Sequence, residues 1–146
     1  MEFTCGTDII EIDRIKESIE TLGERFLNRV YTKKEIEYCE SKKTQKYQHY
    51  AARFAAKEAA FKAVSKYIDN KYEVSWKDFE VVNDENGRPI LKIFNETTEK
   101  DKKEIVAKIK QIDVSLSHCK EYAVANVIVV VPLGTCFFGT NKILKC

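Results

Sequence analysis

The chain of 146 residues is 44% hydrophobic and 33% charged, and its formal net charge is +2. These values are typical of a single soluble domain with a sizeable core. Because the charges nearly balance, the composition gives no reason to expect a nucleic-acid partner. The longest apolar run, residues 127–133, is far too short to span a bilayer, so we expect no membrane partner.

The five cysteines follow no metal-binding or redox spacing. They form no C-x-x-C pair and are accompanied by only two histidines, so a zinc site lacks a convincing ligand set. Free thiols in a reducing compartment are therefore expected. The chain starts directly in a strand-like run, without the pattern of a signal peptide. We expect a cytoplasmic protein, or one of the plastid stroma if a transit peptide has been removed.

The first residues predict one strand followed by a helix. The strand is expected over residues 2–10, and Gly6 within it would allow another backbone to approach closely. Asp8 stands just past this glycine, between apolar neighbours, and an Asp at a strand end is often only a turn or cap residue. We expect Asp13 to cap a helix that ends near Leu22.

Capping signals predict two further short helices before a long one. A short helix is expected over residues 25–30. Thr32 and Glu35 then form the pattern of a capping box, which predicts a helix running to about Cys39. A long central helix is expected over about residues 45–66.

The second half of the chain predicts a hairpin, a helix and two long strands. Ser75 is expected to cap a single turn, and the Asn-Gly pair before Pro89 is a strong hairpin signal. The expected elements are strands over 79–82 and 90–94, an amphipathic helix over 97–110, and strands over 112–117 and 122–131. The last strand is rich in Val and Ala, which indicates burial on both of its faces.

Residues 53–63 (RFAAKEAAFKA) carry the most informative pattern. They are rich in Ala and free of Gly and Pro, which predicts a helix with one small face where another backbone can lie close. Glu58 and Lys62 lie one turn apart on this helix. Such a pair is often a plain surface contact worth roughly 0.2–0.5 kcal/mol. The functional alternative depends on the other segments of the chain.

Three segments, taken together and in order, resemble the holo-acyl-carrier-protein synthases, the short-chain branch of the 4′-phosphopantetheinyl transferases. They are residues 6–12 (GTDIIEI), 53–63 and 114–123 (VSLSHCKEYA). The resemblance covers about residues 3–131 and includes the turn over 83–89. It implies an α+β fold in one phosphopantetheinyl transferase-like domain, residues 1–131, with a mostly antiparallel sheet packed on a long central helix. It also implies a homotrimer with active sites between subunits. The tail, residues 132–146, matches no family segment that we recognise, and its role stays open.

The resemblance implies a specific enzyme reaction. The family transfers the 4′-phosphopantetheine arm of coenzyme A to a serine of apo-acyl carrier protein, for fatty acid biosynthesis, and releases adenosine 3′,5′-bisphosphate. Asp8 and Glu58 match its ligands of a Mg²⁺ ion on the pyrophosphate, and Lys62 matches its lysine at this place. Mg²⁺ usually takes one or two carboxylates together with phosphate oxygens and waters, so these residue types suit the role. Either Glu58 or a metal-bound water is the candidate base for the serine.

The resemblance also assigns binding residues. The implied coenzyme-binding residues are Arg53, Lys62, Ser65, Asn86, Gly87, Arg88, Pro89, Ser117 and His118. The implied docking residues for the acidic carrier protein are Arg14, Lys16, Arg25 and Arg29. The alternatives are a structural histidine at His118 and plain solvated faces for the basic residues. The family's glycine-bearing loop after Lys62 is missing here, where Ser65 and Lys66 stand in its place.

Two rival functions fit the same carboxylates. A metal-dependent phosphohydrolase would use Asp8 and Glu58 to cut a nucleotide pyrophosphate with water, and it would consume coenzyme A without any carrier protein. A non-catalytic module that binds the carrier or the nucleotide would keep its function after Glu58→Gln. The transferase is the interpretation that the three segments favour.

Overall fold

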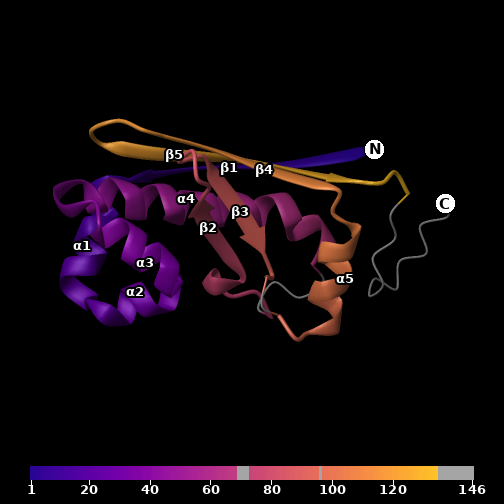
Figure 1. Cartoon of the computed structure of the whole chain (residues 1–146), viewed down its shortest axis with the longest axis horizontal. Coiled ribbons are helices and arrows are strands. Elements are labelled where there is room, and N and C mark those ends of the chain that lie inside the picture. The colour runs from indigo at the N-terminus through magenta and orange to yellow at the C-terminus, as the bar shows by residue number, and fades with distance from the viewer. Residues whose placement is uncertain (69–72, 96, 135–146) are drawn as a thin grey trace.

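Two antiparallel sheets and one long helix organise the fold (Figure 1). The structure is a computed structural model and describes residues 1–68, 73–95 and 97–134. Its helices and strands are β1 (Glu2–Glu11), α1 (Ile12–Leu22), α2 (Glu24–Val30), α3 (Lys33–Glu40), α4 (Lys46–Val64), β2 (Phe79–Asn83), β3 (Pro89–Ile93), α5 (Lys100–Lys108), β4 (Gln111–His118) and β5 (Tyr122–Val131). Helices α1 to α3 gather at one end of α4, and α5 lies at the other end. The predicted α+β class is confirmed.

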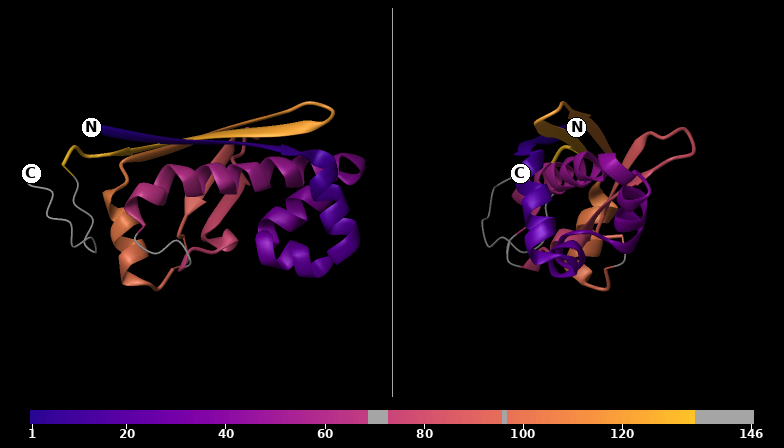
Figure 2. Two further views of the ribbon diagram at one scale, coloured as in Figure 1. Left: turned by 180° about the vertical axis from the view of Figure 1, so that it is seen from behind. Right: turned by 90° about the vertical axis from the view of Figure 1, so that its left-hand side faces the viewer.

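The larger sheet has the strand order β1-β5-β4 and lies on α4, while β2 and β3 form a separate hairpin. Helix α4 contacts β1 and β5 most extensively. The hairpin lies beside the sheet, and its turn projects away from the body of the molecule (Figure 2, right). In the part of the chain that the structure describes, no helix is long and apolar enough to cross a membrane.

The alanine face of α4 allows the sheet to lie very close to it. Ala55, Ala59 and Ala63 are fully buried in the core beneath the sheet. Gly6 of β1 lies against this face, and a Cβ atom placed on it would stand only 1.9 Å from the carbonyl oxygen of Ala59. The expectation that Gly6 permits a close backbone approach is therefore confirmed.

Within one chain, strand β5 is buried mainly on one face, which corrects the sequence prediction of burial on both faces. The side chains that face α4, including Ala125 and Val127, are fully buried. Those on the opposite face include Asn126 and Ile128, which are exposed. A strand alternates its side chains between two faces, and only one face of this sheet carries a helix.

The helix starts test the capping predictions. The capping box of Thr32 and Glu35 is present at the start of α3, and Ser75 caps the 3₁₀ turn η4 (Trp76–Asp78). Asp13 is not a cap, because α1 begins one residue before it and Glu11 occupies the N-cap position. Asp13 instead lies in the first turn, where the helix dipole favours a carboxylate. Of the predicted tail over residues 132–146, everything from residue 135 onwards lies outside the described residues.

Candidate active site

Asp8 and Lys62 meet at the edge of the sheet where β1 lies on α4. Lys62 Nζ is 3.1 Å from Asp8 Oδ1 and donates a second hydrogen bond to the carbonyl oxygen of Thr7 at 2.9 Å. Asp8 shares the inward-facing side of β1 with Gly6, because the two residues are two positions apart. The close approach at Gly6 therefore brings the Asp8 carboxylate within reach of α4.

Glu58 lies one turn before Lys62 and is electrostatically coupled to both residues. Burial raises the pKa of the Glu58 carboxyl above its ordinary value, the nearby Asp8 charge raises it further, and the Lys62 ammonium opposes the rise. The structure thus brings together Asp8, Glu58 and Lys62 from two distant segments. The ion pair of Lys62 is with Asp8, so the alternative of a plain surface contact between Glu58 and Lys62 does not describe this lysine.

Two half-buried carboxylates that repel each other are a suitable site for a hard divalent cation. Oxygen donors from one or two carboxylates are what Mg²⁺ usually takes from a protein, with phosphate oxygens and waters completing the shell. Among the described residues, no cluster of three or more His, Cys, Asp or Glu side chains could hold a metal on its own. The donor set therefore fits an ion shared with a phosphate ligand better than a closed structural metal site.

A cleft of about 180 Å³ opens beside Glu58. It is lined by Lys57, Glu58, Phe61, Val74, Ser75, Trp76 and Phe79. Trp76 stacks on Phe54 of α4, with ring centroids 4.7 Å apart. Four of the lining residues are apolar, namely Phe61, Val74, Trp76 and Phe79, so this part of the cleft suits an uncharged part of a ligand.

The hairpin turn carries four of the residues predicted to bind the coenzyme. Asn86, Gly87 and Arg88 are exposed in this turn, and Gly87 has a φ of 81°. The Arg88 guanidinium pairs with both carboxylate oxygens of Asp113 on β4, each at 3.2 Å. Together with Pro89, Arg88 lines a groove of about 390 Å³ over the outer face of the sheet.

Arg53 anchors this turn from beneath. Its side chain is only 2% exposed, donates to Asn83 Oδ1 at 2.7 Å and lies 4.0 Å from the centre of the Tyr38 ring. Asn83 in turn donates to the carbonyl oxygen of Gly87 at 2.8 Å. In this chain Arg53 therefore holds the turn, and its contact with a coenzyme phosphate stays a prediction.

Ser117 and His118 lie on opposite faces of β4. His118 faces the α4 side, where its ring lies 6.2 Å from that of His49, while Ser117 faces the outer side, as the alternation of a strand requires. His49 was missed in the sequence, although it lies one turn before Arg53 on the same helix. Burial, followed by the Arg53, Lys42 and His118 charges, lowers the pKa of His49, which favours the neutral imidazole.

The remaining predicted residues lie after Lys62 and on helices α1 and α2. Ser65 donates its hydroxyl hydrogen to the carbonyl oxygen of Lys62 at 2.8 Å, and Lys66 pairs with Glu2. The four predicted docking residues are exposed on α1 and α2: Arg14, Lys16, Arg25 and Arg29. The exposure fits both a docking surface and an ordinary solvated face.

Within one chain, the residues predicted for one site fall into two groups. Asp8, with Glu58 and Lys62 beside it, belongs to the β1 edge of the sheet, whereas Arg88 is held at the β4 edge by Asp113. Strand β5 lies between these two edges. The fold of a single chain does not bring the two groups together.

An α+β domain that brings two interacting carboxylates and a lysine together has side chains suited to an enzyme acting on a phosphate ester. The family model described as the 4′-phosphopantetheinyl transferase superfamily matches residues 4–127. The chain therefore belongs to that superfamily, and the resemblance stated from three sequence segments is confirmed. So is the interpretation as an enzyme of the holo-[acyl-carrier-protein] synthase type.

Relatives support this assignment over nearly the whole chain. The holo-[acyl-carrier-protein] synthase of Ruminiclostridium cellulolyticum is 46% identical over 145 residues, covering 98% of this chain and 100% of the relative. That of Koribacter versatilis is 42% identical, covering 84% of this chain and 94% of the relative.

Solved structures of relatives contain the coenzyme. The Bacillus anthracis holo-(acyl-carrier-protein) synthase in complex with CoA (3′,5′-ADP) is 35% identical, with a TM-score of 0.65 over 86% of this chain and 94% of that one. The Helicobacter pylori enzyme in complex with coenzyme A is 28% identical, with a TM-score of 0.71 over 86% of this chain and 99% of that one.

Proposed function

We propose that this protein transfers 4′-phosphopantetheine from coenzyme A to a serine of an apo-acyl carrier protein and releases adenosine 3′,5′-bisphosphate, in a Mg²⁺-dependent reaction that serves fatty acid biosynthesis. The observation that carries the proposal is the convergence of Asp8, Glu58 and Lys62. Membership of the superfamily and the coenzyme A found in structures of relatives support the choice of substrate.

Each residue of this group has a role that its contacts support. Asp8 and Glu58 would hold Mg²⁺, which when bound neutralises the charge that builds on a breaking pyrophosphate. Lys62 orients Asp8 in this chain, and its half-exposed ammonium can also reach a phosphate oxygen. Glu58 lines the cleft, and we assign it the proton of the attacking serine.

We further propose that the working enzyme is a homotrimer with shared active sites. The outer face of the sheet exposes large apolar side chains: Phe3 is 67% exposed, Ile9 60% and Ile128 49%. The groove beside Arg88 lies on the same face and includes Ile128. A second copy against this face would bury these side chains, and it could bring one chain's nucleotide-binding residues to the carboxylates of its neighbour.

The carrier protein is proposed to dock on α1 and α2. The exposed cations Arg14, Lys16, Arg25 and Arg29 would steer an acidic partner, an effect that salt weakens.

Three thiols, those of Cys5, Cys39 and Cys119, are free among the described residues. Free thiols suit the proposed reducing compartment, the cytoplasm or the plastid stroma.

The test is mass spectrometry of an apo-acyl carrier protein incubated with this protein, coenzyme A and Mg²⁺. We expect one phosphopantetheine group on the carrier serine, none with a chelator, and none with Asp8→Asn or Glu58→Gln in a folded protein. Asp101→Asn, at an exposed residue of α5, is the matched control and should retain transfer. Consumption of coenzyme A without carrier would favour the phosphohydrolase, and normal transfer by Glu58→Gln would contradict the catalytic site.

A further inference from the structure

A fully buried ion pair lies beside the candidate active site and has no part in the function described so far. Lys57 Nζ on α4 is 2.7 Å from Glu35 Oε2 on α3, and both side chains are 0% exposed. Lys57 directly precedes Glu58 in the chain. Burying two charges is expensive, and such a pair is seldom more stable than apolar residues of the same size. Stability alone therefore does not account for this pair.

Besides contacting each other, both side chains of this pair hold backbone groups. Lys57 Nζ donates to the carbonyl oxygen of Trp76 at 3.1 Å and to that of Phe79 at 2.6 Å. Glu35 Oε1 accepts from the backbone N–H of Val81 at 2.8 Å, and Oε2 accepts from that of Thr32 at 2.9 Å. The two side chains thereby fasten the turn η4 and the start of β2 to helices α3 and α4.

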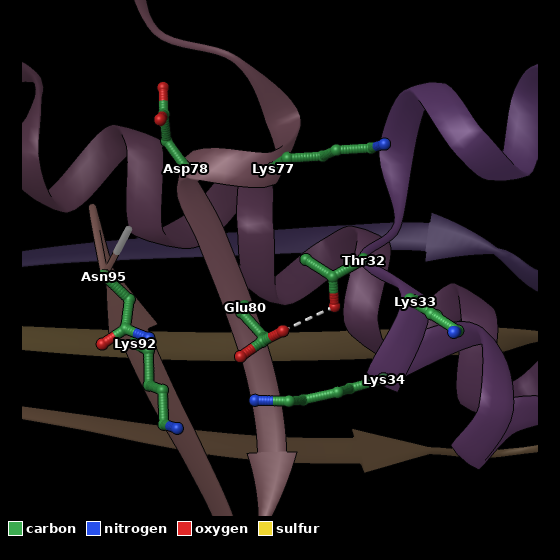
Figure 3. Close-up of a pocket in the computed structure, with 8 residues that line it drawn as sticks. All are labelled: Thr32, Lys33, Lys34, Lys77, Asp78, Glu80, Lys92 and Asn95. Carbon is green, nitrogen blue, oxygen red and sulfur yellow. Dashed lines mark hydrogen bonds between the residues drawn. The ribbon is translucent and has the colours of Figure 1, made fainter. Parts of the chain in front are cut away.

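The solvent side of this junction is closed by a second contact (Figure 3). Thr32 donates its hydroxyl hydrogen to Glu80 Oε2 at 2.7 Å, which joins the start of α3 to β2. Lysines surround this hollow, but Figure 3 shows that Lys33 and Lys77 point away from its centre. The hollow therefore lies on the outer side of the junction, and its lysines do not converge on a common point as they would in an anion-binding site.

The backbone held by Lys57 is the wall of the cleft at Glu58. Trp76 and Phe79, whose carbonyl groups accept from Lys57, both line that cleft. On a helix, Lys57 and Glu58 are fixed relative to each other, so a hydrogen bond from Lys57 sets the distance from Glu58 to the facing wall. This relationship connects the ion pair with the chemistry.

We propose that Glu35 and Lys57 are positioning residues, which hold the Trp76 turn at the correct distance from Glu58 so that the reacting groups are aligned in the cleft. The proposal deepens the transfer function proposed above and rests on it. Loss of the Lys57 hydrogen bonds would let the wall move, and a misplacement of about 1 Å can lower a rate by about 100-fold. The effect is expected in kcat more than in the KM for coenzyme A, whose phosphates are assigned to other residues.

Three variants separate positioning from stability. Lys57→Met leaves the Glu35 charge buried and unpaired, so it should lower both stability and kcat. In the double variant Glu35→Gln with Lys57→Met, no unpaired charge remains, and stability should recover in part. The double variant should still show a kcat lowered by about 10- to 100-fold, because the Trp76 and Phe79 carbonyls still lack their donor. Glu35→Gln alone keeps the lysine donors and should lose the least activity.

The matched control is Lys46→Met, which breaks an exposed pair between the same two helices, with Glu40 at 3.2 Å. It should keep wild-type kcat. Activity is measured at a temperature where circular dichroism shows each variant to be fully folded. A double variant whose kcat recovers together with its stability would overturn the proposal, and if Lys57→Met does not fold, this double variant decides.

A second measurement needs no substrate. Trp76 is the only tryptophan of the chain, so acrylamide quenching of its fluorescence reports how accessible this part of the wall is. Both variants that lack Lys57 should be quenched more strongly than wild type and Lys46→Met. Unchanged quenching would reject the positioning role. If wild-type protein transfers nothing to a carrier, the proposed function fails, and the quenching result still tests whether Lys57 holds the Trp76 turn in place.

Discussion

Gly6 and Ala59 lie so close together that only a glycine fits at the first position. A Cβ atom on Gly6 would stand 1.9 Å from Ala59 O and 3.0 Å from the backbone nitrogen of Ala63. Both obstacles are helix backbone, which cannot swing aside as a side chain can. This contact fixes β1 on α4 and, two residues later, directs Asp8 towards Lys62.

The substitution Gly6→Ala is therefore expected to be strongly disruptive. Forcing the strand off the helix should cost about 3 kcal/mol, the upper end of the usual range for overpacked cores. It should also reduce transfer in the molecules that remain folded, because Asp8 moves with the strand. Urea unfolding measures the first effect and the carrier assay the second. Cys5→Ala, on the exposed face of the same strand, is the control, and a loss as small as that of the control would refute the prediction.

The raised pKa of Glu58 predicts how stability depends on pH in the absence of metal. The folded pKa lies above the ordinary value of 4.5, so the folded state holds a proton that the unfolded chain has already released. Stability is therefore lost as the pH rises from that ordinary value through the raised pKa. Glu58→Gln escapes this loss and should be more stable than wild type above the raised pKa, although it is inactive.

Urea unfolding in a chelator at a series of pH values measures this difference. The gain in unfolding free energy from Glu58→Gln should be absent at acid pH. It should grow as the pH rises from the ordinary pKa of a glutamate through the raised pKa of Glu58, and then level off. In an Asp8→Asn background the gain should be smaller but still present, because burial is the larger cause of the shift and the Asp8 charge the next. A gain that is equal at all pH values would contradict this account.

Charge reversal at Arg14 tests the docking surface. Arg14→Glu should raise the KM for the carrier protein more than the KM for coenzyme A, and the effect should shrink at high salt. Lys103→Glu reverses an exposed charge on α5, away from α1 and α2, and should leave both values unchanged. Equal changes in the two KM values for Arg14→Glu would refute docking at this position.

A lysine on the outer face of the sheet tests the trimer. Ile128→Lys places a charge among the apolar side chains that a second copy would cover, so it should give monomers and lose transfer. Val106→Lys makes the same kind of change at an exposed apolar residue of α5 and should leave the assembly intact. Light scattering with size-exclusion chromatography gives the mass of each. A wild-type monomer with full activity would contradict the shared sites.

Much of the fold could be predicted because its signals are short in range. The capping box at Thr32 and Glu35 and the Asn86–Gly87 turn depend on neighbours a few residues away, and both are found where expected. Asp13 failed as a cap because Ile12, buried against the core, continues the helix back to Glu11. Local capping preference is weak compared with such packing.

The site shows where sequence patterns stop being informative. Asp8, Glu58 and Lys62 could be named because the family motifs contain them, and the structure brings them together. The buried partner of Lys57 could not be found, because its contact with Glu35 depends on the packing of two helices. The burial of β5 within one chain was overestimated for a related reason. Apolar residues indicate that a face can be buried, but only the assembled layers show what covers it.

Asp8 lies on the edge strand β1, whereas Arg88 is paired with Asp113 on the opposite edge strand β4, and this separation has a consequence for genetics. If neighbouring copies share each site, a mixture of two impaired enzymes, one with Asp8→Asn and one with Arg88→Ala, can exchange subunits and form hybrids. Some junctions in these hybrids then pair an intact aspartate with an intact arginine. Activity would reappear in the mixture although neither parent has it, and two defects within one self-sufficient chain could never be rescued in this way.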